Sequence, residues 1–409
     1  MGKKKKIIND PVFGFITIPT DFLYNLVQHP YLQRLNRIKQ MGLAYMVYPG
    51  AQHTRLHHSI GAMYLMSEAV TNLRAKGHDV TEDEANGAMA CILLHDVGHG
   101  PFSHALEYTL MNGIHHEDLS LMLMEELNKE LNGALDICIS IFKNEYPKKF
   151  LHQLVSGQLD VDRLDYLRRD SFFTGVTEGN IGSARIIKMM DVRNDNLVVE
   201  AKGIYSIENF LTSRRLMYWQ VYLHKTAVAA EKMLIKTLMR AKELTDKGAI
   251  LFGSPSLLYF LTNKVSIDHL KSNKEEVLHH FTNLDDNDIW CALKVWSTHK
   301  DSVLSKLSSG LINRRLFKIE ITSGPMSESE IAKYTERYRQ AFDELTDDDI
   351  TYFYSSNKIF TNMYTEEDDN ISILYNDGTI KDISEASDML NIQLLSKKVE
   401  KYYFSYLKV

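Results

Sequence analysis

Apolar side chains recur at helical spacing through most of the first 245 residues of the chain. Between Thr54 and Lys76, for example, Leu56, Ile60 and Met63 lie near one face of a helix. We predict helices at residues 54–76, 82–95, 103–111, 116–131, 159–172 and 206–244, the last of them unusually long. One short strand is expected ahead of these helices, at residues 12–18.

The pattern changes after Gly248, where short extended segments replace the long helices. Strands are expected at residues 316–321, 350–354 and 371–375, and Asn376-Asp377-Gly378 is a turn signal after the last of them. We therefore predict a mainly α protein in three parts. These are an N-terminal extension with a short strand (residues 1–20), a helical core (residues 21–245) and a smaller mixed α/β region (residues 246–409).

The composition is that of an ordinary globular protein, because apolar residues make up 44% and charged residues 24% of 409 positions. No apolar run approaches the length of a membrane span, and no apolar stretch typical of a signal peptide follows the basic N-terminus. Three scattered cysteines are too few for a disulfide framework. We expect a cytoplasmic protein with no membrane partner, and the net charge of -6 argues against a dedicated nucleic-acid binder.

Histidine is concentrated in one part of the chain, since nine of the 16 histidines lie between His53 and His116. A single histidine is most often structural, and we interpret His53, His78 and His152 in that way. Several histidines with aspartates at fixed offsets are different, because imidazole and carboxylate are the ligands of hydrolytic metal ions. The cluster therefore indicates a metal site.

The string from Leu93 to His104 carries the most specific pattern. His95 and Asp96 stand at the predicted end of a helix, where adjacent side chains would normally diverge. Gly98 and Gly100 loosen the backbone there, so both side chains can turn toward one ion.

The order His58, His95-Asp96, Asp162 resembles the H…HD…D signature of the HD superfamily of metal-dependent phosphohydrolases. The segments 9–11, 34–42, 54–61, 95–107 and 160–170 further resemble its deoxynucleoside triphosphate (dNTP) triphosphohydrolase branch, and the resemblance covers roughly residues 7–230. It implies an HD-domain helical core in which these four residues bind one divalent metal ion. The ligand set leaves the metal open among Mn, Mg, Fe, Ni, Co and Zn.

The resemblance also implies roles for residues around the metal. His104 and His116, with Glu107 where the family has a shorter Asp, match residues that act on the α-phosphate and the leaving oxygen. Gln40 and Asp170 match residues that hold the sugar 3′-hydroxyl, and Met41 lies beside Gln40. Tyr166 and Tyr222 match aromatic residues that pack on the deoxyribose ring. Tyr222 would leave no room for a 2′-hydroxyl.

Helical spacing supports part of this assignment. Asp162, Tyr166 and Asp170 fall at i, i+4 and i+8, so one helix face offers a ligand, an aromatic ring and a second carboxylate. Asp165 and Arg169 lie alongside, and for these two a purely structural salt bridge is the competing interpretation.

Basic groups are needed to balance the phosphate charge. Arg55 precedes His58 by three residues, and Arg163, Arg214 and Lys225 are further candidates. In the long helix Arg214, Tyr218, Val221 and Lys225 recur at i, i+4, i+7 and i+11, which predicts that both cations point inward rather than form a solvated face.

The chain departs from the family at a regulatory site. Where the family reads a guanine nucleotide with an acid and an arginine, the matching positions are Gln28 and Asn36, and neither reproduces that ionic recognition. We therefore do not expect activation by GTP through that site, and another allosteric arrangement is left open. The resemblance also implies a homo-oligomer, either a dimer or a tetramer.

The first functional hypothesis is hydrolysis of a dNTP to a deoxynucleoside and triphosphate. The alternative is an HD phosphohydrolase that acts on another nucleotide, such as a nucleoside monophosphate or a cyclic nucleotide. A third, of a different class, is a non-catalytic nucleotide-binding regulator. The presence of His104 and His116 beside the four metal residues speaks against the third, because a binding module has no need of all six.

Overall fold

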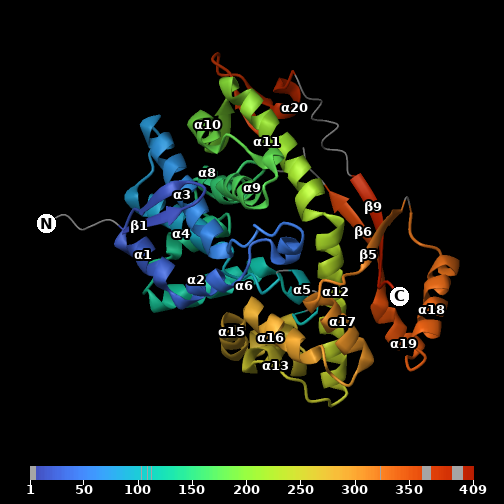
Figure 1. The fold of residues 1–409 in the computed structure, drawn as a ribbon. Coiled ribbons are helices and arrows are strands. Elements are labelled where there is room, and N and C mark those ends of the chain that lie inside the picture. Colours follow the sequence, from blue (N-terminus) through green and yellow to red (C-terminus); the bar gives the residue numbers. More distant parts are fainter. Residues whose placement is uncertain are drawn as a thin grey trace.

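A β-hairpin opens the chain in the computed structural model, which describes residues 6–102, 104–107, 109–111, 113–322, 324–361, 370–388 and 399–409. Strands β1 (Lys6–Asp10) and β2 (Gly14–Ile18) pair antiparallel (Figure 1). The Asp10 carboxylate accepts the N–H groups of Val12 and Phe13, and Gly14 turns the chain with a φ of +77°. The strand expected at residues 12–18 therefore begins two residues later, and its partner β1 was not predicted.

Ten α-helices of the described chain follow the hairpin (Figure 1). They are α1 (Asp21–Gln28), α2 (Pro30–Arg34), α3 (Arg55–Ala75), α4 (Glu82–Leu94), α5 (His104–Glu107), α6 (His116–Glu130), α7 (Asp136–Phe142), α8 (Lys149–Val155), α9 (Val161–Thr174) and α10 (Ser183–Met189). Helix α3 is central, since it is buried along most of its length and packs on both α4 and α9. The mainly α prediction is confirmed.

The ends of the central helices are set by local sequence. Thr81 and Glu84 form a capping box that begins α4. The Asp160 side chain accepts the N–H of Arg163 at 2.7 Å and begins α9, and Gly175, with φ of +75°, ends it. These caps fix where α4 begins and where α9 begins and ends, and therefore where the polar side chains of α9 emerge.

The helix expected at residues 206–244 is wrong as a single element. The structure has α11 (Ile204–Met217), a π-helical turn (Tyr218–Tyr222), a break, and α12 (Lys225–Asp246). His224 caps the second helix, because its Nδ1 accepts the N–H of Thr226. The helical spacing expected from Arg214 to Lys225 is therefore lost at this break.

The C-terminal part begins with helices and ends in a small sheet. The helices are α13 (Pro255–Thr262), α14 (Ile267–Ser272), α15 (Lys274–Thr282), α16 (Asp286–Trp296) and α17 (Ser302–Ile312). The antiparallel sheet has the order β5 (Lys318–Thr322), β9 (Val399–Tyr406), β6 (Tyr354–Thr361), and it lies beside α12 with α18 (Glu328–Ala341) and α19 (Asp347–Ile350) next to it (Figure 1).

A second small sheet joins the middle of the chain to its C-terminal part. Its order is β3 (Met190–Arg193), β4 (Asn196–Glu200), β7 (Ser372–Leu374), β8 (Ile380–Asp382), with β4 and β7 parallel, and α20 (Ile383–Ala386) follows it. The strands expected at residues 316–321 and 371–375 and the turn at Gly378 are confirmed. The strand expected at residues 350–354 is wrong, because β6 begins only at Tyr354 and Thr346 with Asp349 forms a helical capping box before it.

One connected apolar core runs from Ile16 of the hairpin through the central helices to Leu311 of α17 and Ile373 of β7. The C-terminal helices therefore share a core with the helices that carry the candidate site. No described helix is long and apolar enough to cross a membrane.

Candidate active site

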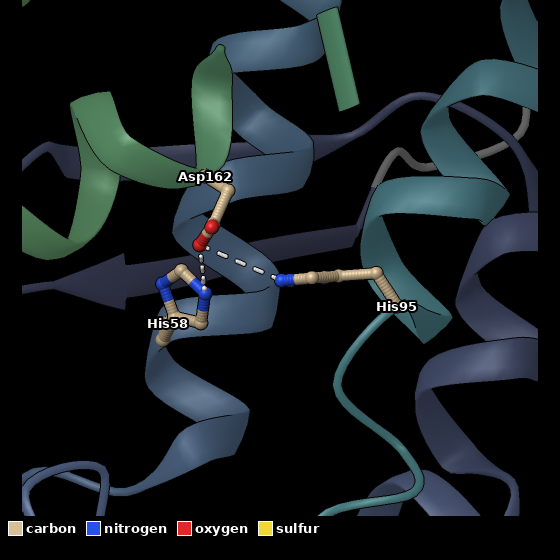
Figure 2. Close-up of side chains that lie close together, drawn as sticks. All are labelled: His58, His95 and Asp162. Atoms are coloured by element: carbon tan, nitrogen blue, oxygen red, sulfur yellow. Dashed lines mark ion pairs between the residues drawn. The ribbon is translucent and has the colours of Figure 1, made fainter. Parts of the chain in front are cut away.

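Four side chains meet where α3, the end of α4 and the start of α9 come together. Figure 2 shows three of them, His58, His95 and Asp162. Nε2 of His58 lies 3.0 Å from Asp162 Oδ1 and 3.9 Å from Asp96 Oδ2. Nε2 of His95 lies 3.5 Å from Asp162 Oδ1 and 3.3 Å from Asp96 Oδ1. The structure thus brings together all four residues expected to bind a metal ion. We call His58, His95, Asp96 and Asp162 the metal group.

The chemistry of this group fits a divalent cation. Nε2 of both His58 and His95 is buried and has no aligned hydrogen-bond partner among the described residues. Burial acts to lower the pKa of His58, but the carboxylates of Asp162 and Asp165 outweigh it and raise that pKa to about 10. Two buried imidazoles that converge on two carboxylates form a site with excess negative potential, which a metal ion would neutralise.

A chain of buried ion pairs holds His58 in place. Nδ1 of His58 bonds Asp165 Oδ2 at 2.7 Å, Asp165 pairs with Arg169 at 2.9 Å, and Arg169 reaches Asp10 of the hairpin at 2.7 Å. Because Nδ1 is used in this way, Nε2 is the nitrogen turned toward Asp162. Asp165 and Arg169 thus do form a salt bridge, as the competing interpretation held, and the salt bridge orients His58, a candidate metal ligand.

Asp96 links the metal group to a second set of histidines. Its carboxylate lies 2.5 Å from Arg55 Nη1 and 3.3 Å from His99 Nε2. His99 stacks on His116 with ring centroids 3.9 Å apart, and Nδ1 of His116 bonds Glu107 at 3.0 Å. Burial, with Arg55 close by, lowers the pKa of His99 to about 3, so this ring is neutral at physiological pH.

These groups open onto a cavity of about 780 Å³, a size within the usual range of small-molecule sites. Of the residues expected to act on a substrate, those that line it are Gln40, Met41, Arg55, His116, Arg163, Tyr166, Asp170, Tyr218 and Tyr222. His104 begins α5, and its side chain lies outside the described residues.

One wall of the cavity is aromatic and rigidly held. The Tyr222 hydroxyl donates to Asp170 Oδ2 at 2.7 Å, and the other oxygen of Asp170 bonds His53 Nε2 at 2.6 Å. Tyr166 meets Tyr222 edge to face, with centroids 6.1 Å apart. The Gln40 Oε1 atom, which lines the same cavity, is buried without a hydrogen-bond partner among the described residues.

The basic residues expected at the site are divided by the structure. Arg163 lines the cavity, although its Nε is taken by Gly157 O and Asp160. Arg214 is buried and donates to Gln158 at 3.0 Å, outside the cavity lining. Lys225 is exposed and does not line the cavity, because the chain breaks just before it and the predicted register is lost.

Other residues at the site were not predicted. His99 lies only four residues after His95 within the same motif, and that spacing is the signal that would have identified it. Glu231, Lys232 and Lys358 also line the cavity, but they come from α12 and β6, far from any motif. His53, interpreted from the sequence as structural, supports Asp170.

Gln28 and Asn36 lie together on a separate pocket of about 240 Å³ between the hairpin and the start of α3. The lining residues are Ile8, Asn9, Asp10, Val27, Gln28, Gln33, Asn36, Leu56, His57 and Ile60. No Lys or Arg is among the described residues that line it.

Comparison with known families agrees with this geometry. The chain matches the HD domain family over residues 55–170 and the HD associated region over residues 181–251. The first match includes all four residues of the candidate metal group.

Individual relatives extend the match over the whole chain. The crystal structure of a phosphohydrolase from Bacteroides thetaiotaomicron is 63% identical, with a TM-score of 0.96 over 99% of this chain and all of that one. The Bacillus subtilis protein YwfO is 31% identical over 94% of this chain and 88% of its own. The deoxynucleoside triphosphate triphosphohydrolase SAMHD1 homolog of Dictyostelium discoideum is 28% identical over 85% of this chain and 64% of its own.

Proposed function

Because the chain belongs to the HD superfamily of metal-dependent phosphohydrolases and resembles its dNTP-hydrolysing members, we propose that it converts a dNTP and water to a deoxynucleoside and triphosphate. The observation that carries this proposal is the aromatic wall of the cavity. Tyr222, fixed by its bond to Asp170, stands with Tyr166 beside the metal group, which suits a sugar held next to a reacting phosphate. The SAMHD1 name of the Dictyostelium relative supports the same substrate class.

We assign His58, His95, Asp96 and Asp162 as the residues that hold one divalent ion, which when bound would supply Lewis-acid polarisation at the α-phosphate. Arg55 serves two purposes in this proposal. Its Nη1 holds Asp96 at 2.5 Å, and its positive charge faces the cavity where phosphate oxygens would lie. Arg163 adds a second positive charge to the same cavity.

Of the described residues, His116 is the one best placed to move a proton. Its Nδ1 bonds Glu107 at 3.0 Å, which orients the ring, and Nε2 of His116 would pass a proton to the leaving 5′-oxygen. The resemblance assigns a related role to His104. His99, held neutral beside Asp96, would orient rather than transfer protons.

Sugar selection follows from the other end of the cavity. The buried Gln40 Oε1 would accept the single proton of the 3′-hydroxyl, and Asp170 lines the same cavity. The ring of Tyr222 cannot move without losing its bond to Asp170, so a 2′-hydroxyl would press against it. Homo-oligomerisation stays a prediction.

The experiment that tests the proposal is a substrate panel with metal-defined protein. Each dNTP, each ribonucleoside triphosphate, the nucleoside monophosphates and the cyclic nucleotides are incubated separately, and the phosphorus products are identified. We expect triphosphate from dNTPs. Orthophosphate from a monophosphate would instead favour another HD phosphohydrolase activity, and binding without any turnover would favour a regulator.

A further inference from the structure

The side chain of Asp286 lies behind the candidate site, although it comes from the C-terminal helices. It is the first residue of α16 and is only 4% exposed. Its Oδ2 accepts the backbone N–H of Lys39 at 2.9 Å, and its Oδ1 accepts the backbone N–H of Phe102 at 3.3 Å. One buried carboxylate therefore joins two segments that are more than 60 residues apart in the chain.

Both of these segments line the substrate cavity. Lys39 immediately precedes Gln40 and Met41, and Phe102 itself lines the cavity at the end of the loop that carries His99. The two segments also lie close together, since a Cβ added at Gly42 would lie 4.0 Å from the Phe102 Cα. Asp286 thus holds two adjoining parts of the cavity lining in one arrangement.

A second set of bonds fastens the same region. Arg34 donates from Nε to Leu284 O at 2.9 Å and from Nη1 to Val97 O at 3.4 Å, and its guanidinium lies over the ring of Phe281. Arg37 pairs with Asp285 at 2.5 Å. The chain just before α16 is therefore fixed to the segment before Gln40 and to the turn after Asp96.

The N-terminus of α16 is capped without the side chain of Asp286. Asp285 caps the helix through the N–H of Asn287, and Asp288 completes the capping box by accepting the N–H of Asp285 at 2.7 Å. Burial raises the pKa of Asp286 to about 6, and the N–H groups of Lys39 and Phe102 act in the opposite direction. A buried carboxylate that costs free energy and is bonded entirely to the cavity segments points to a role at the cavity.

We propose that Asp286 is a positioning residue of the active site, which acts through the backbone of Lys39 and Phe102 to place Gln40 against the substrate sugar and His99 beside the metal group. This proposal rests on the proposed function in one respect, that the sugar is that of a dNTP. The C-terminal helices would then contribute to catalysis, because Asp286 of α16 holds the cavity lining in place without touching the substrate.

The first test is hydrogen–deuterium exchange on the full chain, with Asp286→Asn compared with wild type. Asparagine has the same shape but only one acceptor oxygen, so it can serve one of the two N–H groups. Residues 38–44 and 97–102 should exchange about tenfold faster in the variant, as expected when a buried hydrogen bond is lost. Asp288→Asn is the matched control, because it removes a carboxylate from the same helix end without touching either segment.

Two exchange results would overturn the proposal. Unchanged exchange in Asp286→Asn would mean that the carboxylate does not hold the segments. Equal acceleration in Asp286→Asn and Asp288→Asn would mean that only the stability of α16 matters. Should Asp286→Asn fail to fold, Asp286→Glu keeps two acceptors on a longer side chain, and it should alter exchange at the same two segments and nowhere else.

The second test measures sugar recognition. If Asp286 places Gln40, the preference for a dNTP over its 2′,3′-dideoxy analogue, measured as a ratio of kcat/KM values, should fall about fivefold or more in Asp286→Asn and stay constant in Asp288→Asn. A preference unchanged in Asp286→Asn contradicts the placement of Gln40. Wild-type protein that turns over no dNTP would overturn the proposed function alone, and the exchange measurement then decides the role of Asp286.

Discussion

Asp165 accepts a hydrogen bond from Nδ1 of His58 at 2.7 Å, and both side chains are fully buried. This bond decides which ring nitrogen of His58 faces Asp96 and Asp162. We predict that Asp165→Asn weakens divalent metal binding by about 10–100-fold, the usual cost of losing the carboxylate behind a ligand histidine. Titration calorimetry with Mn²⁺ checks this prediction.

The control for that variant is Asp191→Asn. Asp191 bonds His78 just past the other end of α3, so the same kind of pair is changed away from the metal group. Metal affinity should be unaltered there. Equal losses in both variants would show that Asp165 acts only through general stability.

Gly61 makes the close packing around Asp165 sterically feasible. A Cβ at this position would overlap the Asp165 carboxylate and the Arg169 guanidinium. Gly61→Ala should therefore lower the free energy of unfolding by about 1–3 kcal/mol, as overpacking does, and should also weaken metal binding. Urea denaturation measures the first effect. Gly182→Ala, whose Cβ would meet nothing closer than 3.9 Å, should change neither quantity.

Metal binding should stabilise the fold. Asp96 and Asp162 already face His58 and His95, so an ion binds the folded chain far better than the unfolded chain. At a free metal concentration of 100 times Kd, the free energy of unfolding should rise by about 2.7 kcal/mol. Thermal denaturation with and without Mn²⁺ measures the shift in Tm. Asp162→Ala should remain folded and show no shift, and a shift that persists in this variant would place the ion elsewhere.

Tyr222 should control the choice between deoxyribose and ribose. Tyr222→Ala removes the ring, so the ratio of kcat/KM for a dNTP over its ribonucleotide should fall about tenfold or more, even if both activities decrease. Tyr222→Phe keeps the ring and loses only the bond to Asp170, so it should retain most of the preference. A ratio that is unchanged in Tyr222→Ala would mean that the ring does not face the sugar.

The sequence predicted those parts of the site that depend on short-range pattern. His58, His95, Asp96 and Asp162 could be recognised because each stands in a motif whose residues have few other reasons to occur together. The helices that carry them were predicted because apolar periodicity and end caps are local signals.

The missed features depend on contacts between distant residues. The helix around Tyr222 is interrupted where the Tyr48 hydroxyl donates to Gln220 O and Tyr222 donates to Asp170, and no local pattern encodes these bonds. Lys225 was misplaced for that reason. Asp286 could not be recognised either, because its partner Lys39 lies 247 residues away. The strand expected at residues 350–354 was avoidable, since Thr346 and Asp349 form a capping box that signals a helix.

Hydrolysis of one dNTP by the Mn²⁺-loaded wild-type protein in ¹⁸O-labelled water, followed by ³¹P NMR, tests the proposed function most directly. We predict triphosphate and deoxynucleoside in equal amounts, with the label on a terminal phosphorus of the triphosphate, because water attacks the α-phosphorus. Orthophosphate or pyrophosphate as the first product, or no product at saturating metal, would contradict it.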